Sequence, residues 1–193
     1  MNTVNERKKA FNTTDIVYIA VAAVLIAICS WISIPTLVPF TMQTFGVFCV
    51  LAILGGKRGT VAIVIYLLIG AVGVPVFANF SAGIGAFLDS SGGYLIGFIF
   101  TGVIYWTGGS IFGKKLWVEI VSLIVGLLVC YAFGTVWFMV VYTRTVETVG
   151  LATALAWCVM PFIIPDMVKL GLALVLAQKL PPLPGESKGR AHK

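Results

Sequence analysis

The sequence predicts an all-α integral membrane protein, a bundle of six transmembrane helices. Three observations predict it: of 193 residues 60% are hydrophobic, only 10% are charged, and the mean hydropathy is +1.05. Soluble domains average about 45–50% apolar and about 25% charged residues. One helical crossing of a hydrocarbon layer about 30 Å thick uses roughly 20 residues, so five or six crossings account for the apolar excess. This composition excludes a soluble enzyme, a disordered chain and a disulfide scaffold.

The first half of the chain contains three expected helices. A basic N-terminal segment, 1–14, ends at a potential N-cap, Thr14 or Asp15, and the first helix runs from residue 16 to about 34. Its apolar run exceeds the roughly 7–15 residues of a signal peptide. Pro35 and Pro39 then bracket a turn before a short second helix at about 40–54, which requires tilt or a thinned bilayer. A basic glycine loop, 55–59, precedes the third helix at 60–76.

The second half contains the other three helices. A Gly/Ser/Asn-rich stretch, 77–91, is too polar and broken for a spanning helix, and we expect it to form an outer loop between helices 3 and 4. The remaining helices are expected at about 94–111, at about 117–142, and in a last segment that ends near residue 177. The stretch 143–161 fits either an outer loop with a short helix or the start of helix six. One transmembrane domain, 15–180, and a polar C-terminal tail, 181–193, complete the organisation.

The basic residues set the orientation. With both termini placed in the cytoplasm, eleven of the 13 Lys and Arg residues fall in inner segments and only Arg144 falls outside. Lys169 lies within the last helix. This excess is the positive-inside pattern and predicts a multi-pass protein with both termini cytoplasmic. Because the basic residues come as short clusters between apolar segments, the net charge of +6 indicates topology rather than nucleic-acid binding.

The most informative polar residues within the apolar segments are Asp166 and Lys169. An ionisable side chain at the bilayer centre costs about 2.5–3.5 kcal/mol on insertion scales, so such groups face an interior cavity and usually have a partner. At a spacing of three, the two residues share one helix face and can neutralise each other. Two interpretations remain open: an ion pair that only tolerates insertion, or a pair that lines a ligand pocket in the outer half.

The glycine-rich stretch forms a second polar concentration on the same side. Non-helical backbone at membrane depth persists only where it packs on protein or lines a cavity. Phe77 and Phe80 offer stacking surfaces and Asn79 offers paired hydrogen bonds, so the segment fits a lid or re-entrant wall. An ordinary flexible outer loop is the alternative. Thr41 and Gln43, at the outer start of the second helix, face the same side.

The first helix carries a stripe of small residues, Ala20, Ala23, Ala27 and Ser30. Small residues allow another helix to approach closely. The spacing alone fits equally a docking face for a partner protein and internal packing within the bundle.

The chain contains no recognisable catalytic or metal-binding set. Its four cysteines lie in or beside apolar runs without metal-like spacing, and its single histidine, His192, lies in the polar tail. We expect buried, unpaired cysteines, no metal and no cofactor. Energy for any active transport must then come from an ion gradient or from another polypeptide.

Four strings carry a resemblance to a known family: VPFTMQTF (38–45), LGGKRGTVAIVIYLLIGAVGVPVF (54–77), GGYLIGF (92–98) and PFIIPDMVK (161–169). The chain resembles the BioY family, the biotin-specific substrate-binding (S) components of energy-coupling factor (ECF) transporters. The resemblance covers roughly residues 15–180. Where the family often has Gly-Pro-Thr-Gly-Gly-Tyr, this chain has Asp-Ser-Ser-Gly-Gly-Tyr at 89–94.

The resemblance implies a function in vitamin uptake across a bacterial plasma membrane. It implies that the six-helix bundle binds biotin in an outward-facing pocket, topples in the membrane and releases the vitamin inside. The implied partners are a transmembrane coupling protein (T component), which the Ala20, Ala23 and Ala27 stripe would contact, and two cytoplasmic ABC-type ATPases. The chain would then be a transporter subunit and no enzyme, with ATP hydrolysed only by its partners.

The resemblance also implies roles for particular residues. Asn79 can donate to and accept from the ureido ring of biotin, Asp166 can accept its N–H groups, and Lys169 can donate to the ureido oxygen or hold Asp166 in place. Other side chains would enclose the rings or reach the ureido or carboxylate groups: Trp31, Phe77, Phe80, Tyr94, Gln43 and Thr41.

Three other functions remain as alternatives. The ligand can be a different vitamin, such as thiamine or riboflavin. A membrane-embedded enzyme would use Asp166 and Lys169 as catalytic groups, but no second polar cluster lies at comparable depth. An ion channel would require a ring of charge or a repeated filter motif, and the sequence contains neither.

Overall fold

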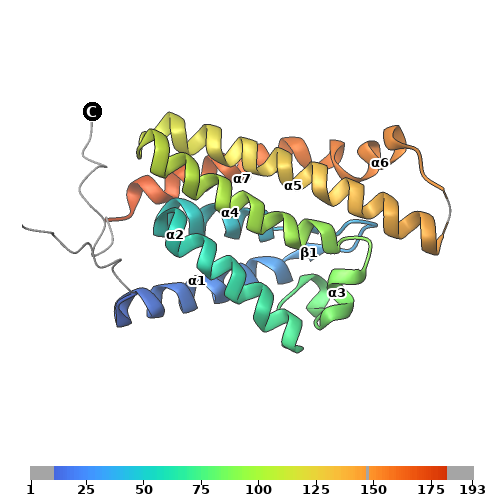
Figure 1. The fold of residues 1–193 in the computed structure, drawn as a ribbon, viewed down its shortest axis with the longest axis horizontal. Coiled ribbons are helices and arrows are strands. Elements are labelled where there is room, and N and C mark those ends of the chain that lie inside the picture. Colours follow the sequence, from blue (N-terminus) through green and yellow to red (C-terminus); the bar gives the residue numbers. More distant parts are fainter. Residues whose placement is uncertain (1–10, 147, 182–193) are drawn as a thin grey trace, which may run out of the picture.

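The protein is an elongated helical bundle, seen in a computed structural model that describes residues 11–146 and 148–181 (Figure 1). The elements, in chain order, are α1 (Thr13–Trp31), β1 (Ser33–Ile34), β2 (Phe40–Thr41), α2 (Gln43–Val72), η1 (Ala78–Phe80), α3 (Ile84–Leu88), α4 (Gly92–Phe112), α5 (Leu116–Thr145), α6 (Leu151–Cys158) and α7 (Met160–Lys179). Most of the predicted terminal segments, 1–14 and 181–193, lies outside the described residues.

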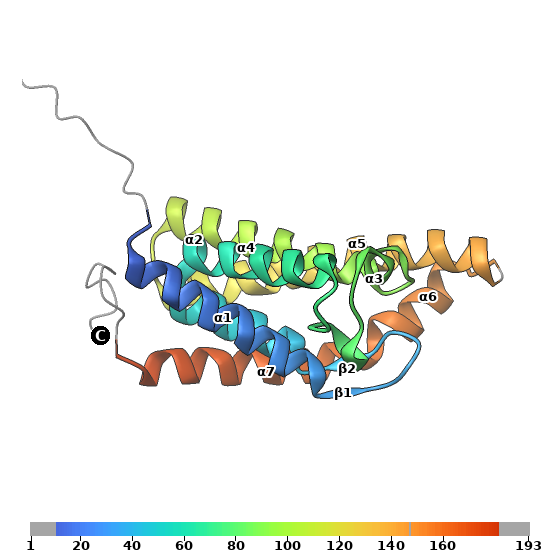
Figure 2. The same ribbon diagram turned by 90° about the horizontal axis from the view of Figure 1, so that it is seen from below.

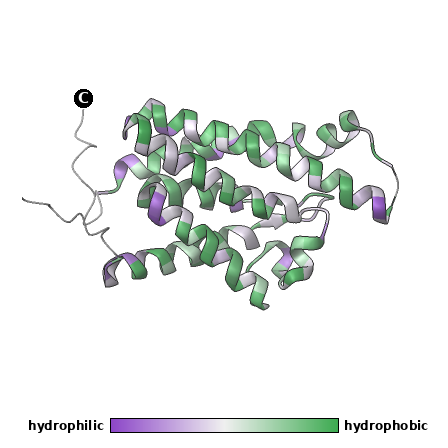
Figure 3. Ribbon diagram, viewed as in Figure 1, coloured by the Kyte–Doolittle hydropathy of each residue, from purple (hydrophilic) through white to green (hydrophobic). Residues whose placement is uncertain are grey.

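The long helices have the length and composition of membrane spans. Within 11–146 and 148–181, five helical segments are long and apolar enough to cross a bilayer, counting α6 and α7 as one. Their residues are hydrophobic for most of each helix, and the most hydrophilic residues lie mainly toward the ends of the bundle (Figure 3). The prediction of an all-α membrane bundle is confirmed at this level.

Helix α2 reverses direction at Gly55, whose backbone adopts φ 78° and ψ 168°. The Nε2 atom of Gln43 donates to the hydroxyl of Tyr66 over 3.0 Å, although 23 residues separate them. A straight helix rising about 1.5 Å per residue would place them roughly 35 Å apart. The helices expected at 40–54 and 60–76 are therefore the two antiparallel halves of α2.

The segment between α1 and α2 differs from the expectation. α1 ends at Trp31 and α2 begins at Gln43, because the chain between them forms an antiparallel hairpin that pairs Ser33 with Thr41 and Ile34 with Phe40. Apolar residues flank the two prolines in this stretch, so a prediction from composition alone extends both helices into it.

The ambiguous stretch 143–161 combines features of both predicted alternatives. α5 continues to Thr145, and after a short connection the eight-residue helix α6 leads directly into α7. Val159 separates the two helices, with φ −125° and ψ −55°.

The small-residue stripe of α1 is largely internal, which favours the alternative of packing within the bundle over a docking face. Ala23 and Ala27 are only 3% and 5% exposed and belong to the main hydrophobic core, where α1 packs on α2. Ala20 is exposed. At their spacing Ala23 and Ala27 lie on the inward face of α1, which leaves Ala20 as the one member available to a partner. The four cysteines are buried and unpaired, as predicted.

The bundle has two distinct ends. The described chain begins and ends at one of them, whereas the β1–β2 hairpin, α3 and α6 cluster at the other (Figures 1 and 2). We call these the terminal end and the hairpin end.

Candidate ligand-binding site

A cavity of about 330 Å³ lies inside the bundle toward the hairpin end. Its walls come from the hairpin, the start of α2, the segment around α3, the first turns of α4, the middle of α5, α6 and the first half of α7. A volume of this order suits a small organic ligand. Six of the nine predicted ligand-site residues line the cavity: Thr41, Gln43, Phe77, Tyr94, Asp166 and Lys169.

The polar centre of the cavity is the ion pair between Asp166 and Lys169. Their Oδ1 and Nζ atoms are 2.8 Å apart, and the two residues are 1% and 5% exposed. The predicted pairing on one helix face is confirmed. Because the charges cancel locally, the cavity contains both a strong acceptor and a strong donor without carrying a net charge from this pair.

Three side chains from three different helices hold the carboxylate of Asp166. Thr44 of α2 donates to Oδ1 over 2.8 Å, Tyr131 of α5 donates to Oδ2 over 2.6 Å, and Lys169 of α7 completes the set. An ionised carboxylate accepts about four hydrogen bonds. Asp166 therefore keeps one acceptor position, on Oδ2, that no described side chain fills.

Lys169, in contrast, uses all three of its ammonium hydrogens. Besides Asp166, its Nζ donates to the backbone oxygen of Thr41 over 2.7 Å and to the hydroxyl of Thr44 over 3.1 Å. It also lies 4.5 Å from the ring centroid of Phe40. Lys169 thus ties α7 to the hairpin and holds Asp166, which is the second of the two roles considered for it.

Gln43 provides a second acceptor. It is 4% exposed, and its Nε2 atom donates to Tyr66. Tyr66 in turn donates to the backbone oxygen of Val76 over 3.2 Å. The carboxamide oxygen of Gln43 has no hydrogen-bond partner among residues 11–146 and 148–181. A buried, unfilled acceptor is unfavourable unless a ligand or water fills it.

Aromatic rings form much of the remaining wall. Phe77 is held edge-on by Tyr66 and Phe87, with ring centroids 5.5 and 5.4 Å away. Tyr94 is fixed by a 3.2 Å hydrogen bond between its hydroxyl and that of Thr135. These contacts place apolar surface opposite the polar centre.

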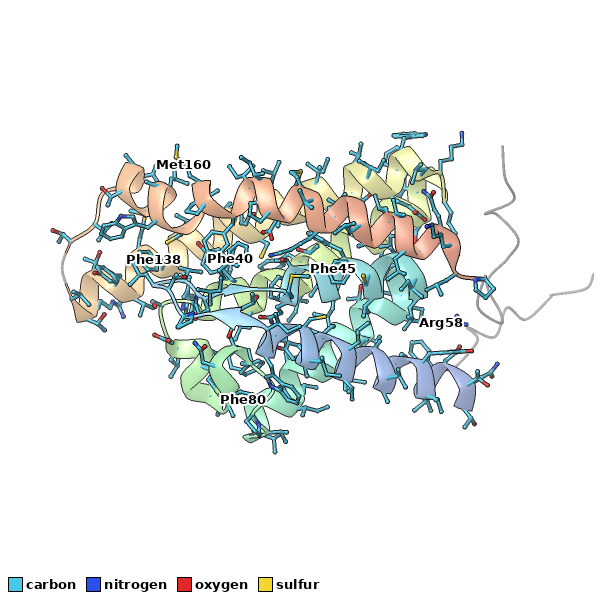
Figure 4. All side chains as sticks on the ribbon, turned by 180° about the vertical axis from the view of Figure 1, so that it is seen from behind. Phe40, Phe45, Arg58, Phe80, Phe138 and Met160 are labelled. Carbon is cyan, nitrogen blue, oxygen red and sulfur yellow. The ribbon has the colours of Figure 1, made fainter. Side chains whose placement is uncertain are left out.

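Trp31, Asn79 and Phe80 do not line the cavity, contrary to expectation. The Trp31 and Phe80 rings stack with centroids 5.4 Å apart, and Phe80 is 63% exposed. Asn79 Oδ1 accepts a hydrogen bond from Ser33 over 3.1 Å. Asn79 and Phe80 have left-handed backbone angles, φ 54° and 57°, which turn their side chains toward the end of α1. In Figure 4 Phe80 lies on the α1 side of the bundle, away from Phe40.

Two hydrogen-bond partners of Asp166, Thr44 and Tyr131, were not identified from the sequence. Thr44 is adjacent to Gln43 in the string VPFTMQTF, so its position in that motif was a usable signal. Tyr131 offered none, because a tyrosine in a long apolar helix is more often a core residue.

Comparison with known proteins identifies the same family that the sequence strings suggested. The model of the BioY family matches residues 4–185. The chain is 39% identical over 143 residues to a probable biotin transporter BioY of Pyrococcus horikoshii, covering 74% of this chain and 80% of that protein. It is 38% identical over 160 residues to the biotin transporter BioY of Thermotoga maritima, covering 81% and 89%.

A solved structure shares the fold. The crystal structure of the S-component for biotin from an ECF-type ABC transporter superposes with a TM-score of 0.74 at 25% sequence identity. The match covers 87% of this chain and 93% of that one.

Proposed function

The chain belongs to the BioY family, and from this premise we propose that it captures biotin outside the cell as the S component of an ECF-type uptake transporter. The observation that carries the proposal is the buried Asp166–Lys169 pair, which lines a vitamin-sized cavity with one acceptor position still open. It is a transporter subunit and not an enzyme.

The cavity chemistry matches the functional groups of biotin. The ureido ring has two N–H donors, and the open position of Asp166 and the carboxamide oxygen of Gln43 can accept them. Thr41 accepts from the backbone N–H of Gln43 over 3.1 Å and keeps its own hydroxyl hydrogen for the ureido oxygen or the carboxylate. Phe77 and Tyr94 enclose the apolar ring. A ligand without these partners would leave buried polar groups unpaired, which gives selectivity.

The same cavity argues against a cationic vitamin such as thiamine. Lys169 already neutralises Asp166 at 2.8 Å, so no unpaired negative charge faces the ligand from this pair. A neutral hydrogen-bonding ring system is the better match.

Six crossings with both termini in the cytoplasm are the topology we propose. The support is the reversal of α2 at Gly55, the position of both described chain ends at one end of the bundle, and the excess of basic residues in the segments assigned to the cytoplasm. In this orientation the cavity opens toward the exterior of a bacterial plasma membrane. The loop 77–91 and the hairpin cover it. Phe80 stacks on Trp31 at the end of α1, and Asn79 accepts a hydrogen bond from Ser33 of β1, so these contacts hold the loop against α1 and the hairpin.

Transport requires partners that use ATP. We propose a transmembrane T component and two cytoplasmic ABC-type ATPases, with Ala20 as the exposed small residue available for docking. The chain itself needs no metal or cofactor for capture.

The test combines two measurements on the protein purified in detergent. Small molecules released by denaturation are identified by mass spectrometry, and equilibrium binding is measured for biotin, thiamine and riboflavin. We expect biotin in the extract and tight binding of biotin alone. Recovery or tight binding of thiamine or riboflavin, with no biotin binding, would contradict the proposal.

A further inference from the structure

A second pocket, of about 470 Å³, lies at the terminal end of the bundle, away from the biotin cavity. Its wall is formed by the start of α1, the reversal of α2, the last turns of α4 and the first turns of α5. None of its lining residues belongs to the cavity described above. Arg58, which lines it, lies at the opposite end of the bundle from Phe138 (Figure 4).

Charged side chains surround this pocket. Three are basic, Lys57, Arg58 and Lys114, and two are acidic, Asp15 and Glu119. Arg58 and Asp15 pair directly at 2.7 Å, which fixes the start of α1 against the reversal of α2. The lining therefore carries more positive than negative charge, and Lys57 and Lys114 have exposed side chains.

Two helix N-termini add positive potential. The second half of α2 begins beside Lys57, directly after Gly55. α5 begins at Leu116, and its N-cap residue is Lys115. The lysine side chain has no acceptor atom, so it cannot cap the first N–H groups of α5. Unsatisfied N–H groups and the helix dipole favour an anion at such positions.

Apolar and aromatic residues line the same pocket. Phe11 and Trp106 are part of the wall, and the ammonium of Lys57 lies 4.7 Å from the ring centroid of Phe11. A basic pocket bordered by aromatic rings near the ends of membrane helices has the composition of a phospholipid headgroup site.

We propose that this pocket binds the phosphate group of an anionic phospholipid through Lys57 and Lys114. The lipid anchors the terminal end of the bundle in the leaflet that surrounds it. The site is independent of the biotin cavity and occupies the other end of the protein.

The test is native mass spectrometry of the detergent-purified protein titrated with phosphatidylglycerol or phosphatidylcholine. Each basic residue near an anionic headgroup contributes on the order of fivefold in affinity, so Lys57→Gln and Lys114→Gln should each weaken phosphatidylglycerol binding about fivefold and together about 30-fold. Phosphatidylcholine should bind more weakly and respond less.

The matched control is Lys115→Gln. Lys115 is exposed and adjacent to Lys114 but does not line the pocket, so its replacement should leave lipid binding nearly unchanged. Unchanged biotin binding in all variants reports that they fold. A further titration uses inorganic phosphate in place of lipid. If inorganic phosphate binds with the same dependence on the two lysines and phosphatidylglycerol does not bind, the ligand of the pocket is free phosphate and the lipid proposal is overturned. Equal losses in all three lysine variants, or no preference for phosphatidylglycerol, would overturn the proposal.

Discussion

Replacing Asp166 with asparagine should weaken both the fold and the binding of biotin, for two separable reasons. The substitution keeps the shape of the side chain but removes the negative charge that lies 2.8 Å from the ammonium of Lys169. Lys169 is 5% exposed and cannot reach solvent without local rearrangement. Its remaining partners, the backbone oxygen of Thr41 and the hydroxyl of Thr44, are dipoles and do not neutralise it.

The magnitudes follow from this geometry. Removing one partner of a buried ion pair costs about 3–5 kcal/mol of folding free energy, because the other charge stays buried and uncompensated. A hydrogen bond to a charged acceptor contributes about 1.5–3 kcal/mol, which corresponds to roughly 10- to 150-fold in biotin affinity.

A double variant separates the two effects. In Asp166→Asn/Lys169→Met the uncompensated ammonium is gone and a side chain of similar length fills its space, so most of the lost stability should return. The biotin affinity should stay low, because the charged acceptor is still missing. Thermal unfolding in detergent measures the first quantity and titration calorimetry with biotin measures the second.

Two outcomes would refute this reasoning. Wild-type biotin affinity in both variants would remove Asp166 from the binding site. Recovery of stability and affinity together in the double variant would reduce the pair to a structural element that tolerates insertion in the membrane.

Two further predictions test packing. Gly70→Ala would place a Cβ 2.0 Å from the ring of Phe77, so we expect a loss of about 1–3 kcal/mol in stability and weaker biotin binding. Gly171→Ala is the control. A Cβ there would meet nothing within 4 Å, so this change should be neutral or slightly stabilising in thermal unfolding. Ala27→Trp should destabilise the bundle because Ala27 is only 5% exposed. Ala20 is exposed, so Ala20→Trp should keep biotin affinity but lower ATP-driven uptake when the partner subunits are present. Normal uptake by the Ala20→Trp variant would remove Ala20 from the docking surface.

The helices were largely predictable because the membrane imposes their length and apolarity. The expected helix at 94–111 is Gly92–Phe112 in the structure, and that at 117–142 is Leu116–Thr145. The β1–β2 hairpin was not predicted, because its pairing depends on contacts between residues on either side of two prolines, and composition does not encode them.

The candidate site also has features that the sequence predicts and features that it does not. The i, i+3 spacing of Asp166 and Lys169 places both on one helix face, so their pairing could be predicted from local geometry. The direction of Asn79 could not, because it depends on a left-handed turn that no residue pattern marked. Tyr131 reaches Asp166 across 35 residues of sequence, and such a contact depends on how the bundle places α5 within side-chain reach of α7.

The most direct test of biotin binding in the hairpin-end cavity is an experimental structure of the protein with biotin bound. The account predicts density in that cavity, with a ureido nitrogen within hydrogen-bond distance of the Asp166 carboxylate and Lys169 still paired with it. Biotin bound elsewhere on the bundle, or in the cavity with its ureido ring pointing away from Asp166, would contradict the account.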